Sequence, residues 1–523
     1  MPYLLHDLII KTSAWAGDKK ALKHKKASLS YKQLEAETIT FANSILSLGI
    51  CKSERIAIYL PKQFEAVISF FSTSLAGGVF VPINPLLKPE QVAYILKDCN
   101  VRILITSPDR ASLLKDTLAE CHDLQHLIIT GDKTIEGVSQ LAVHRWQDLS
   151  SEFRPTTKPS IIDTDMAAIL YTSGSTGKPK GVVLSHRNMV AGAKSVAEYL
   201  NNTATDKLLA VLPFSFDYGF SQLSSAFSVG ASVTLMDYLL PRDVIKAVAR
   251  EKITGLAGVP PLWNQLAQLN WPDEAKECLR YTTNSGGAMP KATLSSLRSA
   301  LTKTDFYLMY GLTEAFRSTY LSPEQIDNRP DSMGKAIPNA EVMVVREDGS
   351  PCTPGEPGEL VHRGSLVALG YWNDAIKTAE RFKPAPNQLS GLKLPEIAVW
   401  SGDSVHMDED GYFYFVARKD DMIKTSGYRV SPTEIEEVIY SSGLVSETAA
   451  LGIDHPTLGQ AIVVVATTNK ETSPDAIINE CKKHLPNFMI PYTVEIKESL
   501  PKNPNGKIDR KLIAAEYQDL FQE

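Results

Sequence analysis

The sequence predicts an α/β protein with a large N-terminal domain of layered α/β subdomains, a β-rich subdomain and a small α+β C-terminal domain. The first observation is length, because 523 residues are too many for one hydrophobic core and predict two or three domains. The second is the alternation of strand-like and helix-like segments over hundreds of residues, which is typical of α/β layers with largely parallel sheets. The third is a change of pattern near Asp420.

Short apolar runs in the first half of the chain predict buried strands. The segments expected there are strands at 55–60, 101–106, 127–130 and 166–171 and an apolar-faced helix at 64–75. The apolar residues 182–184 precede Ser185, a favourable N-cap residue for a helix that carries Met189 and Val196 on roughly one face. This half therefore reads as strands and helices in alternation.

Turn residues and helix-start signals organise the second half. The Pro- and Gly-rich segment 348–358 predicts a turn-dense, β-rich subdomain that includes a strand at 358–362. Ser431-Pro432-Thr433-Glu434 predicts a helix start, with Ser as N-cap and Pro at the first helical position. Ser473 opens a further helix, after a strand at 461–466. We therefore expect one domain over residues 1–419 and another over residues 420–523.

Composition excludes several classes of protein. A net charge of −6 argues against a general nucleic-acid binder. The six cysteines are dispersed without a CxxC pair, which argues against zinc and against a disulfide framework and fits a reducing cytoplasm. The first residues lack a basic region followed by an apolar core, so no secretory signal is expected. No apolar run approaches the ~18 residues of a membrane span. We expect a soluble, cytoplasmic protein.

The segment Tyr171-Thr172-Ser173-Gly174-Ser175-Thr176-Gly177-Lys178-Pro179-Lys180-Gly181 carries the strongest functional signal. It places hydroxyls, glycines and two lysines directly after a predicted buried strand, and such loops bind polyphosphates through N–H groups, hydroxyls and cations. It is not a Walker loop, because two residues rather than four separate Gly174 from Gly177, and Pro179 follows Lys178. A nucleotide-hydrolysing motor or a kinase is therefore excluded.

Further motifs follow in sequence order: Ser285-Gly286-Gly287-Ala288-Met289-Pro290, Tyr310-Gly311-Leu312-Thr313-Glu314, Ser401-Gly402-Asp403, Arg418-Lys419-Asp420-Asp421, Gly427-Tyr428-Arg429 and Pro501-Lys502-Asn503-Pro504-Asn505-Gly506-Lys507. With the loop at 171–181, this set resembles the adenylate-forming superfamily, which includes acyl-CoA synthetases, adenylation domains of nonribosomal peptide synthetases and firefly luciferase. The resemblance spans residues 171 to 507. It implies that the protein is an AMP-forming ligase, which converts a carboxylic acid and ATP to an acyl adenylate and then transfers the acyl group to a thiol.

The resemblance also implies a set of site residues for ATP and Mg²⁺. Mg²⁺ prefers oxygen ligands, and a carboxylate suits two ribose hydroxyls. The implied roles are phosphate binding by Thr172, Ser173, Gly174, Thr176 and Lys178, adenine binding by Gly286, Gly287, Ala288, Tyr310 and Gly311, α-phosphate contact by Thr313, metal binding by Glu314, and ribose binding by Asp403 and Arg418.

Lys507 is implied to be the catalytic lysine, which bridges the carboxylate and the α-phosphate during adenylation. Because it lies in the small C-terminal unit, that unit has to close over the site and is expected to be mobile. The resemblance implies a hinge at Asp420 and a pantetheine tunnel lined by Gly427. Rotation about the hinge would withdraw Lys507 for the thiol step.

The substrate class rests on Phe216 and Asp217. A Phe-Asp pair at this point resembles amino-acid-activating relatives, in which the aspartate pairs with the substrate's ammonium group, and we expect Phe216, Tyr218 and Phe220 to line the pocket. The alternative is that Asp217 caps the next helix or bonds the backbone. The favoured hypothesis is therefore an amino acid loaded on the phosphopantetheine thiol of a carrier protein. An acyl-CoA ligase for a fatty or other plain carboxylic acid is the alternative, and luciferase-like oxidation of the adenylate is a distant one.

Overall fold

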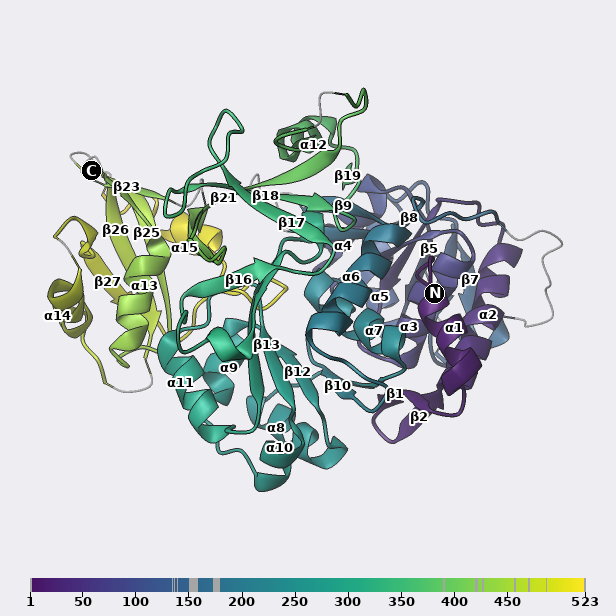
Figure 1. Ribbon diagram of the computed structural model, residues 1–523. Helices are drawn as coiled ribbons and strands as arrows, with labels where there is room; N and C mark the ends of the chain where they lie inside the picture. The colour runs from purple at the N-terminus through teal and green to yellow at the C-terminus, as the bar shows by residue number, and fades with distance from the viewer. Residues whose placement is uncertain are drawn as a thin grey trace.

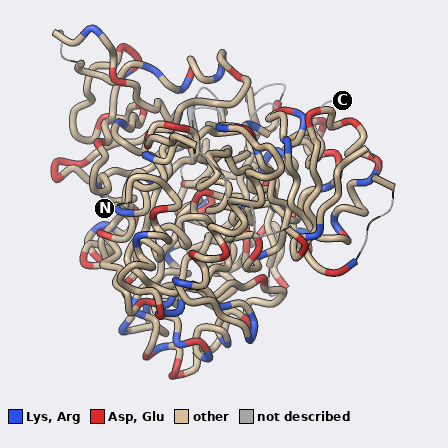
Figure 2. Tube along the Cα trace, turned by 90° about the vertical axis from the view of Figure 1, so that its right-hand side faces the viewer, with Lys and Arg blue, Asp and Glu red and all other residues tan. Residues whose placement is uncertain are grey.

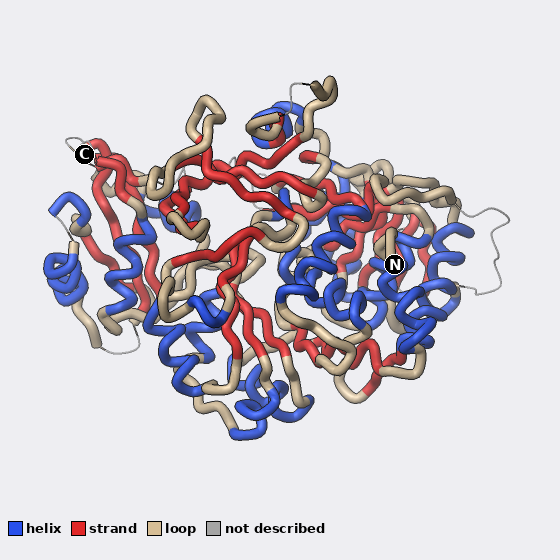
Figure 3. The backbone as a smooth tube through the Cα atoms, in the orientation of Figure 1, coloured by secondary structure: helices blue, strands red, loops and turns tan. Residues whose placement is uncertain are grey.

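The structure is a computed structural model that describes residues 2–521 except 134, 136, 139, 150–158, 173–178, 389–390, 419–421, 426–427, 456–457, 469–470 and 486. Within these residues the strands form three sheets, of fourteen, eight and five strands, with helices packed around them (Figures 1 and 3). The predicted α/β class, with a large N-terminal part and a small C-terminal part, is confirmed.

The eight-stranded sheet is built mainly from the first 185 residues. In spatial order its strands are β19 (Gly370–Tyr371), β9 (Lys180–Ser185), β8 (Met166–Thr172), β4 (Val79–Pro82), β3 (Arg55–Tyr59), β5 (Val101–Thr106), β6 (His126–Ile129) and β7 (Ala142–Arg145). Pairing is parallel from β8 to β7, as expected for apolar strands that alternate with helices. The helical segments between and around its strands are α1 (Asp7–Ala16), α2 (Tyr31–Ser47), α3 (Phe64–Leu75), α4 (Pro89–Asp98), α5 (Pro108–Leu118), η1 (Trp146–Asp148) and α6 (His186–Tyr199).

The fourteen-stranded sheet joins a parallel half to an antiparallel half. In spatial order its strands are β17 (Ala340–Val345), β18 (Gly358–Gly364), β21 (Ile397–Met407), β22 (Phe413–Arg418), β16 (Ser332–Ala336), β15 (Thr319–Leu321), β14 (Asp305–Tyr310), β13 (Tyr281–Asn284), β12 (Gly255–Gly258), β10 (Lys207–Ala210), β11 (Ser232–Leu235), β1 (Lys20–His24) and β2 (Ala27–Ser30), with β20 (Phe382–Pro384) on β21. The strands from β14 to β1 are parallel. The expected β-rich subdomain is thus hydrogen-bonded to the parallel half, because β16 pairs with both β15 and β22.

The helical segments of this region are α7 (Asp217–Val229), α8 (Pro241–Glu251), α9 (Pro260–Leu266), α10 (Asp273–Cys278), α11 (Lys291–Ala300), η2 (Thr313–Ala315), η3 (Pro323–Gln325) and α12 (Ala375–Arg381). Helix α7 is buried along nearly its whole length. Its Phe220 ring packs against Phe70 and Phe80, with centroids 5.7 and 5.3 Å away. A Cβ on Gly219 would lie 1.9 Å from the carbonyl oxygen of Pro213, so glycine is required where the preceding loop meets the helix.

The five-stranded sheet belongs to the C-terminal unit. Its strands are β24 (Tyr428–Val430), β23 (Ile423–Thr425), β26 (Gly459–Thr467), β25 (Glu447–His455) and β27 (Thr493–Ile496), and its helical segments are α13 (Pro432–Ser441), α14 (Pro474–His484), η4 (Asn487–Met489) and α15 (Arg510–Tyr517). Both predicted helix starts are present. Ser473 accepts a capping bond from the N–H of Ala476, whereas the Ser431 hydroxyl donates to the carbonyl of Val416. The boundary between 419 and 420 lies outside the described residues and remains a prediction.

The C-terminal unit lies beside the large N-terminal part, at the left of Figure 1 next to α11. The Asn84 amide donates to the carbonyl oxygen of Pro504 at 2.6 Å, and the N–H of Lys291 donates to Glu437 at 3.3 Å. Basic and acidic residues are interspersed along the chain in Figure 2. Among the helices of the described residues, none combines the length and apolarity needed to cross a membrane.

Candidate active site

The predicted nucleotide residues follow the carboxyl ends of two neighbouring parallel strands. Strand β13 ends at Asn284 and is followed by Ser285 to Ala288, and β14 ends at Tyr310 and is followed by Gly311 to Glu314. Parallel strands bring their carboxyl ends to one edge of the sheet, where open α/β sheets bind ligands. Two motifs that are about 25 residues apart in sequence therefore form one surface.

Lys507 reaches this surface from the C-terminal unit. Its loop is closed by a bridge between Lys502 and Ile508. The Oδ1 atom of Asn503 accepts the N–H groups of Asn505 and Lys507 at 3.0 and 3.1 Å. The Lys507 ammonium lies 5.2 Å from the centroid of the Phe216 ring. The structure thus brings Lys507 to the Phe216 side of the large domain.

The loop after β13 approaches this lysine closely at residue 286. Gly286 has φ +85°, and a Cβ there would lie 2.7 Å from Cε of Lys507. Its backbone conformation favours glycine, and a side chain there would displace the end of Lys507. Gly287 has ordinary φ, and a Cβ there would contact Pro260 at 3.2 Å.

The predicted ribose carboxylate, Asp403, lies on β21 and is 5% exposed. The Tyr310 hydroxyl donates to its Oδ2 at 2.5 Å, which joins the end of β14 to the antiparallel half of the sheet. Across the β21–β22 ladder, Asp403 pairs with Arg418. The side chain of Arg418 lies outside the described part of the structure, so its predicted ribose contact is untested.

Glu314 and Thr313 lie in the short turn η2. The Tyr371 hydroxyl donates to Oε1 of Glu314 at 2.6 Å and holds the carboxylate in place. Burial, together with this carboxylate, raises the pKa of Tyr371 well above its usual value, so the phenol stays a donor. A fixed carboxylate is an oxygen donor of the kind that Mg²⁺ prefers, so the residue fits the predicted metal role.

Asp217 is the first residue of α7 and is 2% exposed. Its Oδ1 accepts a hydrogen bond from the Thr313 hydroxyl at 3.2 Å. Burial raises the pKa of the Asp217 carboxyl, and the nearby charges of Arg317 and Lys507 and the bond from Thr313 oppose this effect in part. The structure therefore joins the two residues predicted to contact substrate and α-phosphate.

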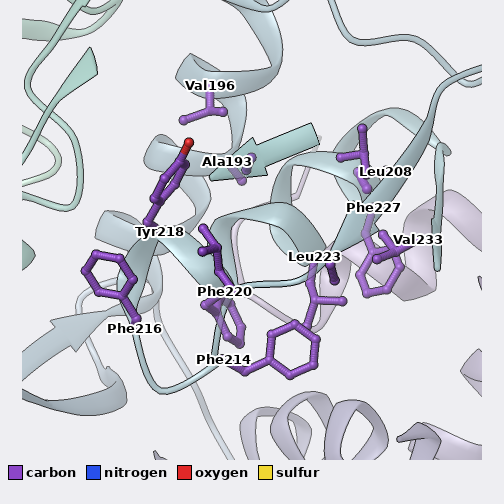
Figure 4. Close-up of a cluster of buried hydrophobic side chains, with 14 of the residues drawn as sticks. Ala193, Val196, Leu208, Phe214, Phe216, Tyr218, Phe220, Leu223, Phe227 and Val233 are labelled. Carbon is purple, nitrogen blue, oxygen red and sulfur yellow. The ribbon is translucent and has the colours of Figure 1, made fainter. Parts of the chain in front are cut away.

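The predicted lining of the substrate pocket needs one correction. Phe216 and Tyr218 lie at the site, but Phe220 is fully buried in the core on the other side of α7, beside Phe214 (Figure 4). Residues two apart on a helix are separated by roughly 200° around its axis, so 218 and 220 cannot share one face. The Tyr218 side chain extends instead toward Val196.

The structure describes only the two ends of the predicted phosphate loop. Thr172 ends β8 and pairs with Lys180 of β9, and the Ser185 hydroxyl accepts the N–H of Asn188 as the predicted cap of α6. Ser173, Gly174, Thr176 and Lys178 lie outside the described residues, as do the predicted hinge residue Asp420 and tunnel residue Gly427. Their roles remain predictions.

Sequence reasoning missed Arg317, three residues after Glu314. Its side chain is 1% exposed and stacks over the Tyr218 ring at 4.6 Å. The sequence offered one signal for it. This arginine stands among the apolar and small residues Ala315, Phe316 and Ser318, shortly after a predicted metal ligand. It went unused because a single arginine in a sequence is most often a surface charge.

Residues 11–372 match the family of AMP-binding enzymes, and residues 434–507 match the AMP-binding enzyme C-terminal domain. A long-chain-fatty-acid–CoA ligase of Salmonella typhimurium is 30% identical over 518 residues, which cover 92% of this chain and 89% of that protein. A linear gramicidin synthase of Brevibacillus parabrevis is 27% identical over 516 residues, which cover 98% of this chain and 10% of that protein.

Solved structures with a similar fold cover the whole chain. The anthranilate CoA ligase AuaEII in complex with anthranoyl-AMP is 25% identical with a TM-score of 0.86, over 99% of this chain and 98% of that one. ATP-bound MatB from Rhodopseudomonas palustris is 23% identical with a TM-score of 0.86, over 100% of both chains.

Proposed function

We infer that this chain, which belongs to the family of AMP-binding enzymes and is an AMP-forming ligase, is a CoA ligase for a plain carboxylic acid, one without an α-amino group. The observation that carries the adenylation step of this proposal is the meeting of Lys507 with Phe216 and Gly286, beside the Thr313–Asp217 pair. The C-terminal unit supplies the cation, and the large domain supplies the strand ends predicted to hold ATP.

In the first half-reaction, a carboxylate oxygen attacks the α-phosphorus of ATP and pyrophosphate leaves. We propose that the Lys507 ammonium lies against the carboxylate and the α-phosphate, where negative charge accumulates, and that Thr313 contacts the α-phosphate. Preorganised donors of this kind stabilise the transition state of phosphoryl transfer. Mg²⁺ held by Glu314 would neutralise charge on the phosphates. Asp403 accepts from the ribose hydroxyls, in place of the Tyr310 hydroxyl that it binds here.

In the second half-reaction, the thiol sulfur of CoA attacks the acyl carbon and the bond to AMP breaks. Support for CoA as acceptor comes from relatives named as CoA ligases that match over nearly their whole length. The match to gramicidin synthase covers 10% of that protein, so the hypothesis of an amino acid on a carrier protein has less support. Asp217 also has a partner within the protein, which an ammonium-binding role does not require.

Pyrophosphate exchange tests the first step. With ATP, Mg²⁺ and the correct acid, labelled pyrophosphate should appear in ATP without any thiol. Adding CoA should then give an acyl-CoA and AMP in equal amounts. Formation of ADP and phosphate would contradict the proposed chemistry. Loading of a carrier protein in preference to CoA would restore the carrier-protein hypothesis, and light or CO₂ from the adenylate would indicate luciferase-like oxidation.

A further inference from the structure

The loop that carries Lys507 contacts both large sheets. On one side, the Lys507 side chain lies against Phe216 and Gly286, in the segments that follow β10 and β13 of the fourteen-stranded sheet. On the other side, the carbonyl oxygen of Pro504 accepts a hydrogen bond from the side-chain amide of Asn84 at 2.6 Å. Asn84 follows β4 of the eight-stranded sheet. The lysine loop of the C-terminal unit therefore lies between the two sheets of the large domain.

Asn84 lies at the edge of the eight-stranded sheet where the predicted phosphate loop begins. Strands β4 and β8 are parallel neighbours, and Phe80 pairs with Ala168. Four residues further along each segment, the chain reaches Asn84 and Thr172, the first residue predicted to bind phosphate. Parallel neighbours leave a sheet at the same edge. Asn84 is therefore placed to hold the lysine loop beside the predicted phosphate site.

Two hydrogen bonds fix the orientation of the Asn84 amide. Its Oδ1 atom accepts the main-chain N–H of Leu86 at 2.9 Å, and its Nδ2 group donates to the carbonyl of Pro504. Because the N–H requires an acceptor and the carbonyl requires a donor, the two ends of the amide cannot be exchanged. Asn84 is 5% exposed, so little water competes for the bond to Pro504. The side chain thus joins a local turn to the C-terminal unit.

Hydrogen bonds within the loop connect Pro504 to Lys507. The Oδ1 atom of Asn503 accepts the N–H groups of Asn505 and Lys507, and the N–H of Asn503 donates to the carbonyl of Lys507 at 2.7 Å. Pro504 lies inside this closed turn, three residues before Lys507. A bond to the Pro504 carbonyl therefore fixes the turn as a whole, and with it the main chain from which the Lys507 side chain extends.

We propose that Asn84 is a positioning residue for adenylation, whose amide holds the lysine loop in the orientation in which Lys507 faces the strand ends. This inference rests on the proposed ligase function. Asn84 acts through the loop and takes no part in bond formation. Its bond to Pro504 joins the large domain to the C-terminal unit, so it is lost in the orientation predicted for thiol transfer. Removing the bond should therefore slow adenylation and spare the thiol step.

Two substitutions separate this role from the local turn. Asn84→Asp keeps an acceptor for the N–H of Leu86 but turns an acceptor, in place of a donor, toward the carbonyl of Pro504. Asn84→Ala removes both bonds without adding a charge. Pyrophosphate exchange should slow by about 5–150-fold in Asn84→Asp, which opposes two acceptors, and by about 2–12-fold in Asn84→Ala, which loses a neutral hydrogen bond.

Thioester formation from pre-made acyl adenylate is the second readout, and both variants should keep the wild-type rate there. The matched control is Asn373→Asp. The Asn373 amide also donates to a main-chain carbonyl, that of Asp98 at 2.8 Å, but this bond lies within the large domain. Asn373→Asp should leave both half-reactions unchanged.

The outcomes separate this inference from the proposed function. If no acid supports exchange by the wild type, the ligase proposal fails and this inference fails with it. If the wild type is active and Asn84→Asp exchanges pyrophosphate equally fast, the positioning role is overturned and the ligase proposal stands. Slow exchange in Asn84→Ala alone would assign Asn84 only to the turn at Leu86. Equal slowing of both half-reactions, or a variant that does not fold, would show a structural role and overturn the inference.

Discussion

Asp217 and Arg317 carry opposite charges into the same buried region, but each has a different partner. Asp217 accepts from Thr313 at the start of α7, and Arg317 lies beside the hydroxyls of Ser285 and Ser221 and over the Tyr218 ring. A residue's role here depends on which group lies within hydrogen-bond distance, and charge alone does not decide it. We propose that Asp217 positions Thr313, because this hydrogen bond gives its carboxyl a partner other than a substrate ammonium group.

Replacing Asp217 tests this explanation. Asp217→Ala should lower kcat/KM for a plain acid and for the matching amino acid alike, because the buried Thr313 hydroxyl loses its acceptor at a cost of about 1–3 kcal/mol. That cost corresponds to a loss of about 5–150-fold. Steady-state kinetics on an amino acid and its deaminated analogue would measure it. A selective loss of about 10²–10⁴-fold on the amino acid would instead show that Asp217 pairs with a substrate ammonium group.

At the scale of elements, the site is assembled from loops that follow strands. The loops after β13 and β14 meet because the strands are parallel neighbours, and the loop at 501–508 is added from the C-terminal unit. Rigid strands fix where each loop starts, and the loops themselves supply the N–H groups and small residues that a nucleotide needs. Gly286 shows how closely the two parts approach.

A methyl group at residue 286 should therefore impair adenylation. Gly286→Ala combines a left-handed φ, which costs about 1–2 kcal/mol for an L-residue, with a Cβ that would displace Cε of Lys507 from its position in this structure. The control is Gly49→Ala, which has φ +82° and open space around its Cβ. Both variants should lose similar stability in thermal unfolding, and only Gly286→Ala should slow pyrophosphate exchange. Equal exchange rates in the two variants would show that Lys507 does not approach this loop during catalysis.

At the scale of the whole molecule, the structure places the C-terminal unit with its lysine loop on the large domain. The contacts of Asn84 with Pro504 and of Lys291 with Glu437 hold this arrangement. It is the arrangement expected for adenylation, because Lys507 faces the strand ends. Thiol transfer is predicted to use another orientation, reached by rotation about Asp420.

Two substitutions test whether the two half-reactions use different orientations of the C-terminal unit. Lys507→Ala should slow adenylation by about 10²–10³-fold, since it removes a preorganised cation from the phosphoryl transition state. It should barely change thioester formation from pre-made acyl adenylate. Asp420→Pro at the predicted hinge should largely keep adenylation and abolish thiol transfer. Rapid-quench measurement of each half-reaction would decide the matter, and equal damage to both by Lys507→Ala would exclude a separate role in adenylation.

Three buried histidines should make the free energy of unfolding depend on pH. Burial lowers the pKa of His6, His186 and His362 to about 4 each, and His186 Nδ1 accepts the N–H of Leu5, which requires an unprotonated ring. Below about pH 6.5 the unfolded chain binds protons that the folded chain refuses, so the free energy of unfolding falls as the pH falls. Each histidine contributes up to about 3 kcal/mol of this loss by pH 4.

Thermal unfolding between about pH 7.5 and about pH 5 would measure the effect. The midpoint should drop steeply below about pH 6.5, and His362→Gln should flatten the slope by one histidine's share. His122→Gln serves as the control, because the His122 side chain is not in the core. A midpoint that stays constant over this range would contradict the assignment of neutral buried rings.

The amino-acid sequence by itself determined the fold class, the family and the order of the motifs. Strands such as 55–59 and 101–106, the cap at Ser185 and the motif around Gly286 are local, and local patterns of apolar residues, caps and glycines can be read directly. The candidate nucleotide residues were named from the resemblance of these motifs to the adenylate-forming superfamily. Their roles in binding remain predictions.

Only the tertiary structure decided which distant residues share a space. Phe220 lies in the core because helical geometry turns it away from Tyr218, and the β-rich segment joins the parallel sheet because β16 pairs on both edges. Arg317 could not be recognised from the sequence, since its burial arises from α7 and from strands whose residues lie up to about 110 positions away. Burial replaces the water around an ordinary arginine with the hydroxyls of Ser285 and Ser221 and the ring of Tyr218.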